Sequence, residues 1–319
     1  MTGKGVGMRP WLAVALFAGL GAVLLGCESE VDDRPVIGLV MKSLANEFFA
    51  TMEEGAWAHH ADHEDAYRLR VTGMRDETDV AEQVGIVELM IAQGVDAIVI
   101  APADSQALVG VSQRAMDQGI VVVNIDNKFD EEVLADRGVD IPFVGPDNRK
   151  GAQLAANHLA ERLEAGDQVA IIEGAPNAYN GIQRRLGFED AINEHELDLV
   201  SSQTGYWETD QAMPIASAMI NEYPNLRAIL CANDSMALGA VAALRDAGRT
   251  DEIYVVGFDN ISAVQRLLAE GQILCTVDQH AALLAAYGIQ HALDMLAGDA
   301  SPEDVETPVD LITADTLEP

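Results

Sequence analysis

The chain has 319 residues, 49% of them hydrophobic, which provides enough apolar surface for two globular domains or one large α/β unit. Its 52 Asp and Glu residues outnumber 19 Lys and Arg residues, and the formal net charge of −33 argues against nucleic acids and anionic membrane surfaces as partners. The acidic residues are spread along the chain, which indicates a solvated acidic surface. Salt adaptation is one hypothesis for this surface, and ordinary solubility is the alternative.

The N-terminal segment has the pattern of an export signal. Two basic residues precede an apolar run at residues 11–25, which has the length of a signal peptide and is short for a membrane span. The run ends in Leu-Leu-Gly-Cys at Cys27, which resembles the lipobox of bacterial lipoproteins; a secretory signal with a chance cysteine is the alternative. We expect residues 1–26 to be removed, Cys27 to carry a lipid anchor in the periplasm or at the cell surface, and residues 27–33 to form a tether.

Apolar strand-like runs alternate with helical patterns along the rest of the chain. The expected strands are residues 36–41, 68–73, 96–101, 120–125, 142–145, 168–173, 198–203, 227–232, 253–257 and 272–277. The expected helices are residues 47–61, 79–93, 104–118, 150–165, 182–195, 210–222, 235–247 and 280–297. Continuously apolar strands are typical of parallel sheets covered on both faces by helices. The pattern therefore predicts an α/β fold with two doubly wound parallel sheets.

Cys231 and Cys275 each lie inside an apolar strand-like run. Export makes a disulfide conceivable, but buried cysteines often serve as small hydrophobic residues. In a doubly wound sheet the strand at 253–257 would lie between the two thiols, and two strand spacings are about 9.6 Å, beyond disulfide reach. We predict two free, buried thiols.

Polar residues gather directly after several expected strands. They are Lys42, Asn46, Asp126, Asn127, Asn233, Asp234, Asp259 and Asn260. In open α/β sheets ligands bind outside the carboxyl ends of the strands, so these residues describe one site. Phe48 and Phe49 follow the first strand, and adjacent helical residues point about 100° apart, so at least one ring is free to contact a ligand. The alternative is that either ring belongs to the core.

Sequence signatures of enzymes and metal sites are weak. The chain has no P-loop, no G-x-G-x-x-G after a strand and no G-x-S-x-G motif. Asp126 and Asp259 could form a pair of catalytic acids or could accept hydrogen bonds from sugar hydroxyls. His59 and His63 have the helical i, i+4 spacing of metal ligands, but no second ligand group has matching spacing, so a solvated helix end is favoured. We expect no metal, no cofactor and no catalysis.

Six segments in order carry a family resemblance: SLANEFF, VVNIDNK, RRLGFEDA, CANDSMALGAVAAL, YVVGFDN and CTVDQ. They resemble the signatures of periplasmic sugar-binding proteins of the ribose-binding-protein type, over residues 34–319. The resemblance implies a monomeric receptor that closes around a sugar and delivers it to the permease of an ABC importer. It also implies two Rossmann-like lobes joined by three crossings: residues 34–145 with 280–309, and residues 146–279 with 310–319.

The resemblance further implies a set of ligand-binding side chains. They are Lys42, Asn46, Phe48, Phe49, Asp126, Asn127, Arg184, Trp207, Asn233, Asp259 and Gln279. Aromatic rings suit the apolar faces of a sugar, while carboxylate, amide and guanidinium groups suit its hydroxyls. Trp207 could instead be an aromatic of the lobe surface. Asp234 and Ser235 are expected to cap a helix and are left outside the site.

Two positions depart from the ribose-type pattern. Lys42 stands where a small hydroxyl residue is common, and Asn127 stands where an arginine usually follows the aspartate. These departures put ribose itself in question and suit another pentose, a pentitol or tetritol, or a deoxy or branched sugar equally well. Two cations and two carboxylates among the site residues cancel, which predicts a neutral ligand, since an enclosed anion would be costly to desolvate.

Rival functions belong to other classes. Repressors of the LacI type share the fold, but they begin with a helix-turn-helix and have a basic surface. A sensory receptor that passes the closed form to a chemoreceptor or sensor kinase fits the sequence as well as a transport receptor does. A glycosidase-like enzyme would need a pair of carboxylates at a defined separation.

Overall fold

The structure is a computed structural model that describes residues 1–5, 7 and 32–317, and its helices and strands lie within the compact unit of residues 34–319. Cys27 lies outside the described residues. Two six-stranded sheets organise the unit. The first contains, in spatial order, β11 (Val305–Thr307), β5 (Phe143–Pro146), β4 (Val121–Ile125), β3 (Ala97–Ile100), β1 (Val36–Ser43) and β2 (Arg68–Met74). The second contains β12 (Asp310–Thr313), β10 (Cys275–Asp278), β9 (Tyr254–Val256), β8 (Leu226–Cys231), β6 (Gln168–Glu173) and β7 (Asp198–Thr204).

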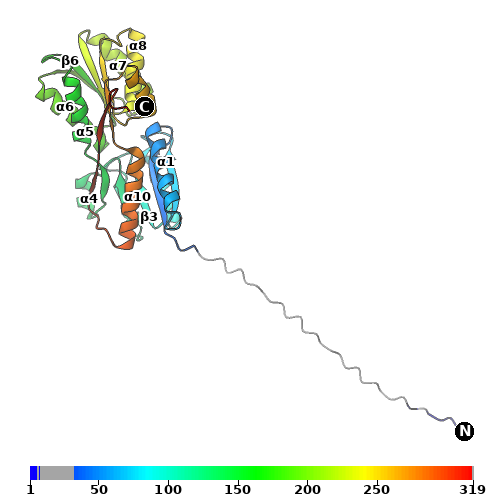
Figure 1. The fold of residues 1–319 in the computed structure, drawn as a ribbon. Helices are drawn as coiled ribbons and strands as arrows, with labels where there is room; N and C mark the ends of the chain where they lie inside the picture. The colour runs from blue at the N-terminus through cyan, green and yellow to red at the C-terminus, as the bar shows by residue number, and fades with distance from the viewer. Residues whose placement is uncertain (6, 8–31, 318–319) are drawn as a thin grey trace. The chain divides into compact units, whose positions relative to one another are not determined.

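Helices connect most successive strands (Figure 1). Those associated with the first sheet are α1 (Glu47–Asp62), α2 (Val80–Ala92), α3 (Val109–Met116), α4 (Glu131–Arg137) and α10 (Ala281–Ala297). Those associated with the second sheet are α5 (Asn148–Ala160), α6 (Tyr179–Glu194), α7 (Thr209–Glu222), α8 (Asp234–Ala247) and α9 (Ser262–Ala269). Each sheet with its helices is called a lobe below.

The two lobes repeat one strand order. Leaving aside the edge strands β11 and β12, the first sheet runs β5-β4-β3-β1-β2 and the second runs β10-β9-β8-β6-β7. The pairs within each run are parallel, as is β11 with β5, whereas β12 pairs with β10 in the antiparallel direction. The prediction of two doubly wound sheets is confirmed, with one antiparallel edge that the apolar pattern did not indicate.

Both faces of the first sheet are buried, as its continuous apolar runs predict. Ile37 and Leu39 of β1 face a core shared with α1 and α10, whereas Val40 faces the residues of α2 and α3. Helices α1 and α10 pack side by side on the first of these faces (Figure 1). In the second lobe, α5 packs with α6 and α7 packs with α8. Parallel strands need this cover because both of their faces are apolar.

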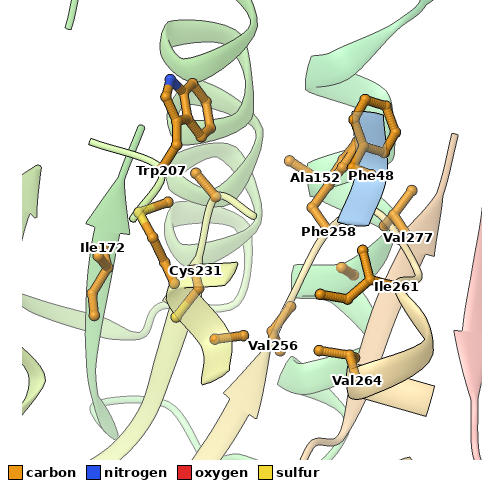
Figure 2. Packing of buried hydrophobic residues seen from close by; sticks show 14 of the residues in the cluster. Phe48, Ala152, Ile172, Trp207, Cys231, Val256, Phe258, Ile261, Val264 and Val277 are labelled. Atoms are coloured by element: carbon orange, nitrogen blue, oxygen red, sulfur yellow. The ribbon is translucent and has the colours of Figure 1, made fainter. Parts of the chain in front are cut away.

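Each expected strand has a counterpart, with ends that differ by at most three residues. The short elements α4, α9, β11 and β12 were not predicted, because three to eight residues do not show a clear period. Cys231 and Cys275 are free and fully buried, and β9 lies between their strands, as the sequence predicted. Figure 2 shows Cys231 and Val256 on neighbouring strands of this core, below Trp207.

None of the helices in the described part of the chain has the length and apolarity that a membrane span requires. Sheet membership changes three times along the chain: between β5 and β6, between β10 and β11, and between β11 and β12. The carboxyl ends of the parallel strands in both lobes carry the polar side chains described next.

Candidate functional site

The first lobe contributes a cation and two aromatic rings to the site. Lys42 lies near the end of β1, and Asn46 caps α1 by accepting a hydrogen bond from the N–H of Phe48 at 3.0 Å. This cap places Phe48 and Phe49 in the first turn of the helix, where their rings meet edge to face with centroids 5.1 Å apart. Both rings are buried, yet both line the site, so the two interpretations of this pair are compatible.

Asp126 follows β4 in the left-handed region, with φ of 61°. Its Oδ2 lies 2.9 Å from Nζ of Lys42, and both side chains are buried. The loop is held by Asn124, whose Nδ2 donates to the carbonyl of Asn127 at 2.8 Å and whose Oδ1 accepts from the N–H of Phe129 at 2.7 Å. An unfavourable backbone conformation at a strand end, maintained by a buried side chain, is typical of a functional site.

The second lobe contributes a buried arginine. Arg184 on α6 donates from Nε to Asn148 Oδ1 at 2.8 Å and from Nη1 to the carbonyl of Ala232 at 2.9 Å. Its Nη1 also lies 3.6 Å from Asp259 Oδ1, and Gln279 donates to the same oxygen at 2.7 Å. Burial lowers the pKa of Arg184 and raises that of Asp259, and the attraction between the two opposes both shifts.

A second buried carboxylate positions the loop that carries Asp259. Asp234 accepts from the N–H of Ile261 at 2.9 Å and from Thr276 Oγ1 at 2.7 Å. A Cβ on Gly257 would lie 2.0 Å from Asp234 Oδ1, so only glycine fits there. The loop contains Asp259 at φ of 126°. Asp234 is therefore not the helix cap that the sequence indicated.

Asn233 caps α8 in place of Asp234 and also holds the aromatic wall. Its Oδ1 accepts from the N–H of Met236 at 2.9 Å, and its Nδ2 donates to the carbonyl of Trp207 at 3.2 Å. Trp207 is 4% exposed and has φ of 72°, and its ring lies against Gly174 and Gly181, so the surface alternative does not hold. Two cations lie close to the indole ring: Nζ of Lys42 and the guanidinium carbon of Arg184 are each 5.7 Å from its centroid.

These side chains converge on one pocket between the lobes. It is lined by Lys42, Asn46, Phe48, Phe49, Glu77, Asp126, Asn180, Arg184, Trp207, Asn233, Asp259 and Gln279. Its cavity volume is about 10 Å³, the space of roughly one water molecule, so a larger ligand requires the lining side chains to move or the lobes to separate. Arg184 Nη2 and Gln279 Oε1 are buried without a hydrogen-bond partner among the described residues, which provides a donor and an acceptor for hydroxyl groups.

Glu77 and Asn180 line the pocket although sequence reasoning did not select them. Glu77 lies between β2 and α2 and accepts from Asn46 Nδ2 at 2.5 Å. Burial raises its pKa to about 7, against the attraction of Lys42. The sequence signal for Glu77 is weak, because the segment before it is not a continuous apolar run. Its position after the second strand was the available clue.

Asn127 does not line the pocket, which differs from the expectation. Its Nδ2 donates to the carbonyl of Pro102 at 2.8 Å, and its Oδ1 accepts from the N–H of Asn180 at 3.1 Å. The side chain is fully buried. The left-handed conformation of Asp126 turns the next residue away from the cavity.

The histidine run does not form a metal site. His59 Nδ1 lies 2.8 Å from the hydroxyl of Tyr67, and the His59 and His63 rings stack with centroids 4.3 Å apart. Across residues 32–317, no group of three His, Cys, Asp or Glu side chains is arranged to hold a metal ion.

Larger hollows lie elsewhere on the protein. One of about 490 Å³ lies beside β5 and the start of α5, and its lining includes Lys128, Arg149 and Asp190. These charges are already paired, Lys128 with Asp304 at 2.8 Å and Arg149 with Asp190 at 2.6 Å. The small pocket is the better candidate because buried, unpartnered polar atoms and aromatic rings converge there.

Comparison with known proteins supports one family. The model of the family described as periplasmic binding protein domain matches residues 37–300. A D-ribose/D-allose-binding protein of Pseudomonas aeruginosa is 51% identical over 98% of this chain and 99% of its own length.

Two solved structures have the same fold. A solute-binding protein of an ABC transporter from Burkholderia multivorans, with an unknown ligand represented as α-D-erythrofuranose, is 53% identical with a TM-score of 0.86. The comparison covers 88% of this chain and 99% of that one. A periplasmic solute-binding protein of an ABC transporter from Actinobacillus succinogenes, with bound D-allose, is 34% identical with a TM-score of 0.84, covering 88% of this chain and 98% of that one.

Proposed function

The chain belongs to the periplasmic binding protein family, and on that basis we propose that it captures a neutral monosaccharide between its lobes and delivers it to an ABC importer. The family is one of solute-binding proteins, so the expectation that the chain is not an enzyme is confirmed. The ligand class is the part that we infer. It rests on the chemistry of the pocket and on the sugars named for the relatives.

The observation that carries the proposal is the polar set of the pocket. Two cations, Lys42 and Arg184, face three carboxyl groups, Asp126, Asp259 and Glu77, all buried. With Glu77 included, the pocket has no surplus of positive charge, so an enclosed carboxylate or phosphate would lack compensation. Hydroxyl groups, by contrast, can donate to the carboxylates and accept from the cations.

D-ribose and D-allose are the first ligands to test. The Pseudomonas relative is named for D-ribose and D-allose, the Actinobacillus structure holds D-allose, and the two sugars share the configuration of three successive hydroxyls in their pyranose rings. A pocket that pairs carboxylates with hydroxyls rejects an epimer strongly, because one buried group then loses its partner. The C3 epimers, D-xylose and D-glucose, are therefore the matched controls.

Calorimetry on residues 34–319 tests the proposal with these four sugars, ribitol, a sugar acid and a sugar phosphate. We expect tight binding of D-ribose, D-allose or both, weak binding of the C3 epimers and none of the anions. Binding of the anionic compounds alone would overturn the neutral-ligand claim. Binding of ribitol above both sugars would shift the claim to polyols.

We also propose that Cys27 carries a lipid and that the lobes are residues 34–145 with 280–309, and 146–279 with 310–319. Changes of sheet membership after β5, after β10 and after β11 support these boundaries.

The lipid claim is tested with Cys27→Ser, which should release the protein from membranes in soluble form, while the unsubstituted protein partitions into detergent. Equal solubility of both proteins would remove the claim.

A further inference from the structure

Two helices of the second lobe begin at the cleft, the region where the two lobes meet, after an apolar residue that offers no capping side chain; a third, α7, begins after Glu208, whose side chain makes no capping bond. Helix α6 follows Ala178 and helix α9 follows Ile261, and neither apolar side chain can accept a hydrogen bond. Helix α5 of the same lobe, by contrast, has its own cap in Asp147. The first N–H groups of any helix lack intrahelical partners and need acceptors from elsewhere.

The first lobe supplies the missing acceptors for α6. Ser105 Oγ accepts from the N–H of Tyr179 at 2.9 Å, and Asn127 Oδ1 accepts from the N–H of Asn180 at 3.1 Å. Both side chains are buried, and Ser105 Oγ in turn donates to Asn127 Oδ1 at 3.3 Å. A serine and an asparagine are the residue types that cap helices best, and here they act across the cleft.

The loop before α6 docks on the same part of the first lobe. The N–H of Ser105 donates to the carbonyl of Asn177 at 3.1 Å, and Asn177 Nδ2 donates to Asp104 at 2.5 Å. The β3–α3 loop and the start of α6 therefore form a continuous hydrogen-bonded contact. Arg184 lies one to two turns further along this helix, so the contact fixes the element that carries the pocket arginine.

The first lobe also supplies the acceptor for α9, through a different element, helix α1. Glu47 Oε1, in the first turn of α1, accepts from the N–H of Ser262 at 2.7 Å. A negative charge at a helix N-terminus is also favoured by the helix dipole. Helix α9 directly follows the loop of Asp259. Helix α6, which carries Arg184, and helix α9, which follows Asp259, thus each begin on an acceptor from the first lobe.

We propose that these caps across the cleft stabilise the closed form, so that Ser105, Asn127 and Glu47 set the affinity for every ligand without contacting any. The inference rests on the proposed function. None of the three residues is among those that line the pocket. When only the closed form binds, the apparent dissociation constant is the intrinsic constant divided by the closed fraction, and each cap raises that fraction.

The test compares variants across ligands. Glu47→Ala, and separately Ser105→Ala with Asn127→Ala, should each raise the dissociation constants for D-ribose and D-allose about three- to ten-fold, within the usual range for a lost cap. The factor should be the same for both sugars. Glu54→Ala, an exposed glutamate on the same helix, should leave the constants unchanged. Unchanged affinity in the cap variants, or unequal factors for the two sugars, would overturn the proposal.

Small-angle X-ray scattering without sugar separates this proposal from the sugar assignment. The cap variants should have a larger radius of gyration than the unsubstituted protein, whichever ligand it binds, and Glu54→Ala should not. Glu47 is on the surface of the cleft, so its variant tests the idea even where the buried Asn127→Ala fails to fold. Equal radii in all proteins would contradict the inference even if D-ribose or D-allose binds tightly.

Discussion

The two loops that carry the pocket carboxylates are built alike but anchored by different chemistry. Asp126 and Asp259 each lie in a loop after a strand, and both residues have positive φ. A fully buried side chain holds each loop. In the first lobe the anchor is the amide of Asn124, which both donates and accepts. In the second it is the carboxylate of Asp234, which accepts from Ile261 and Thr276.

The difference extends to the cations. Lys42 pairs with Asp126 through one flexible ammonium, whereas Arg184 contacts Asp259, Asn148 and the carbonyl of Ala232. A planar guanidinium can hold several acceptors at fixed angles, and an ammonium acts as a point charge. We therefore expect the side of the pocket formed by the second lobe to be more rigid than the side formed by the first lobe.

The largest expected effect is on sugar affinity, and it should be larger for the loss of Arg184 than for the loss of Lys42. Arg184→Ala removes a donor from buried acceptors of Asn148, Ala232 and Asp259, of which Asp259 keeps only Gln279, and should raise the dissociation constant of the bound sugar at least about 100-fold. Lys42→Ala leaves Asp126 without its ion pair and should cost about ten-fold. Calorimetry measures both, and Arg185→Ala, whose side chain pairs with Glu173 and Glu189, is the matched control. An equal loss in the Lys42 and Arg184 variants would break the comparison.

Asn124 and Asp234, the side chains that hold the two loops, differ only in amide against carboxylate. Changing each one to the other residue type should have unequal effects on stability. Asn124→Asp would place carboxylate oxygens against the carbonyls of Ile100 and Asn127 and should lower the free energy of unfolding by about 3 kcal/mol. Asp234→Asn can still accept from Ile261, while the Thr276 hydroxyl rotates to accept, so it should cost about 1 kcal/mol. Urea unfolding measures both. A larger loss in Asp234→Asn would show that its charge, not its shape, holds the loop.

A pH effect should come from Glu77 in the first-lobe wall. Its pKa, about 7 in the folded protein, lies above the usual carboxyl value, so the folded state binds the proton more tightly than the unfolded state does. Stability in the absence of sugar should therefore fall as pH rises from about 4.5 to about 7, by about 3 kcal/mol for this group. Glu77→Gln should flatten part of that slope. An identical slope in the variant would assign the titration to other carboxyl groups.

The smallest effect concerns the surface. Screening should relieve repulsion among the many exposed acidic residues between 0.1 and 1 M salt, as the Debye length falls from about 10 Å to about 3 Å. A gain of about 1 kcal/mol would raise the melting temperature by about 2–4 °C. The buried ion pairs are screened little, so sugar affinity should change much less. A flat or falling melting temperature would count against salt adaptation.

Sequence reasoning was most successful where one local pattern carries the information. Continuous apolar runs predicted the parallel strands, and six motifs in order predicted the family, which the match over residues 37–300 confirms. The apolar runs around Cys231 and Cys275 and the expected strand order predicted two free, buried thiols, as the structure shows. Of the side chains chosen for the site, all but Asn127 line the pocket in the structure.

Sequence patterns failed where a side chain acts on a residue far along the chain. Asp234 looked like a helix cap, but its partners Ile261 and Thr276 lie in other segments. Glu77 enters the pocket because β2 lies next to β1, a pairing that no local pattern contains.

By itself, the sequence determined the alternation of strands and helices, the burial of the sheets and the chemical types at the strand ends, because each depends on neighbours within a few residues. The tertiary structure alone decided which amide lines the pocket and which one bridges the cleft. Asn46 and Asn127 are the same residue type, and each follows a strand of the same sheet, β1 and β4 respectively. Asn46 caps its own helix beside the pocket, whereas Asn127 caps α6 of the other lobe, because a hydrogen bond depends on where its partner lies in space.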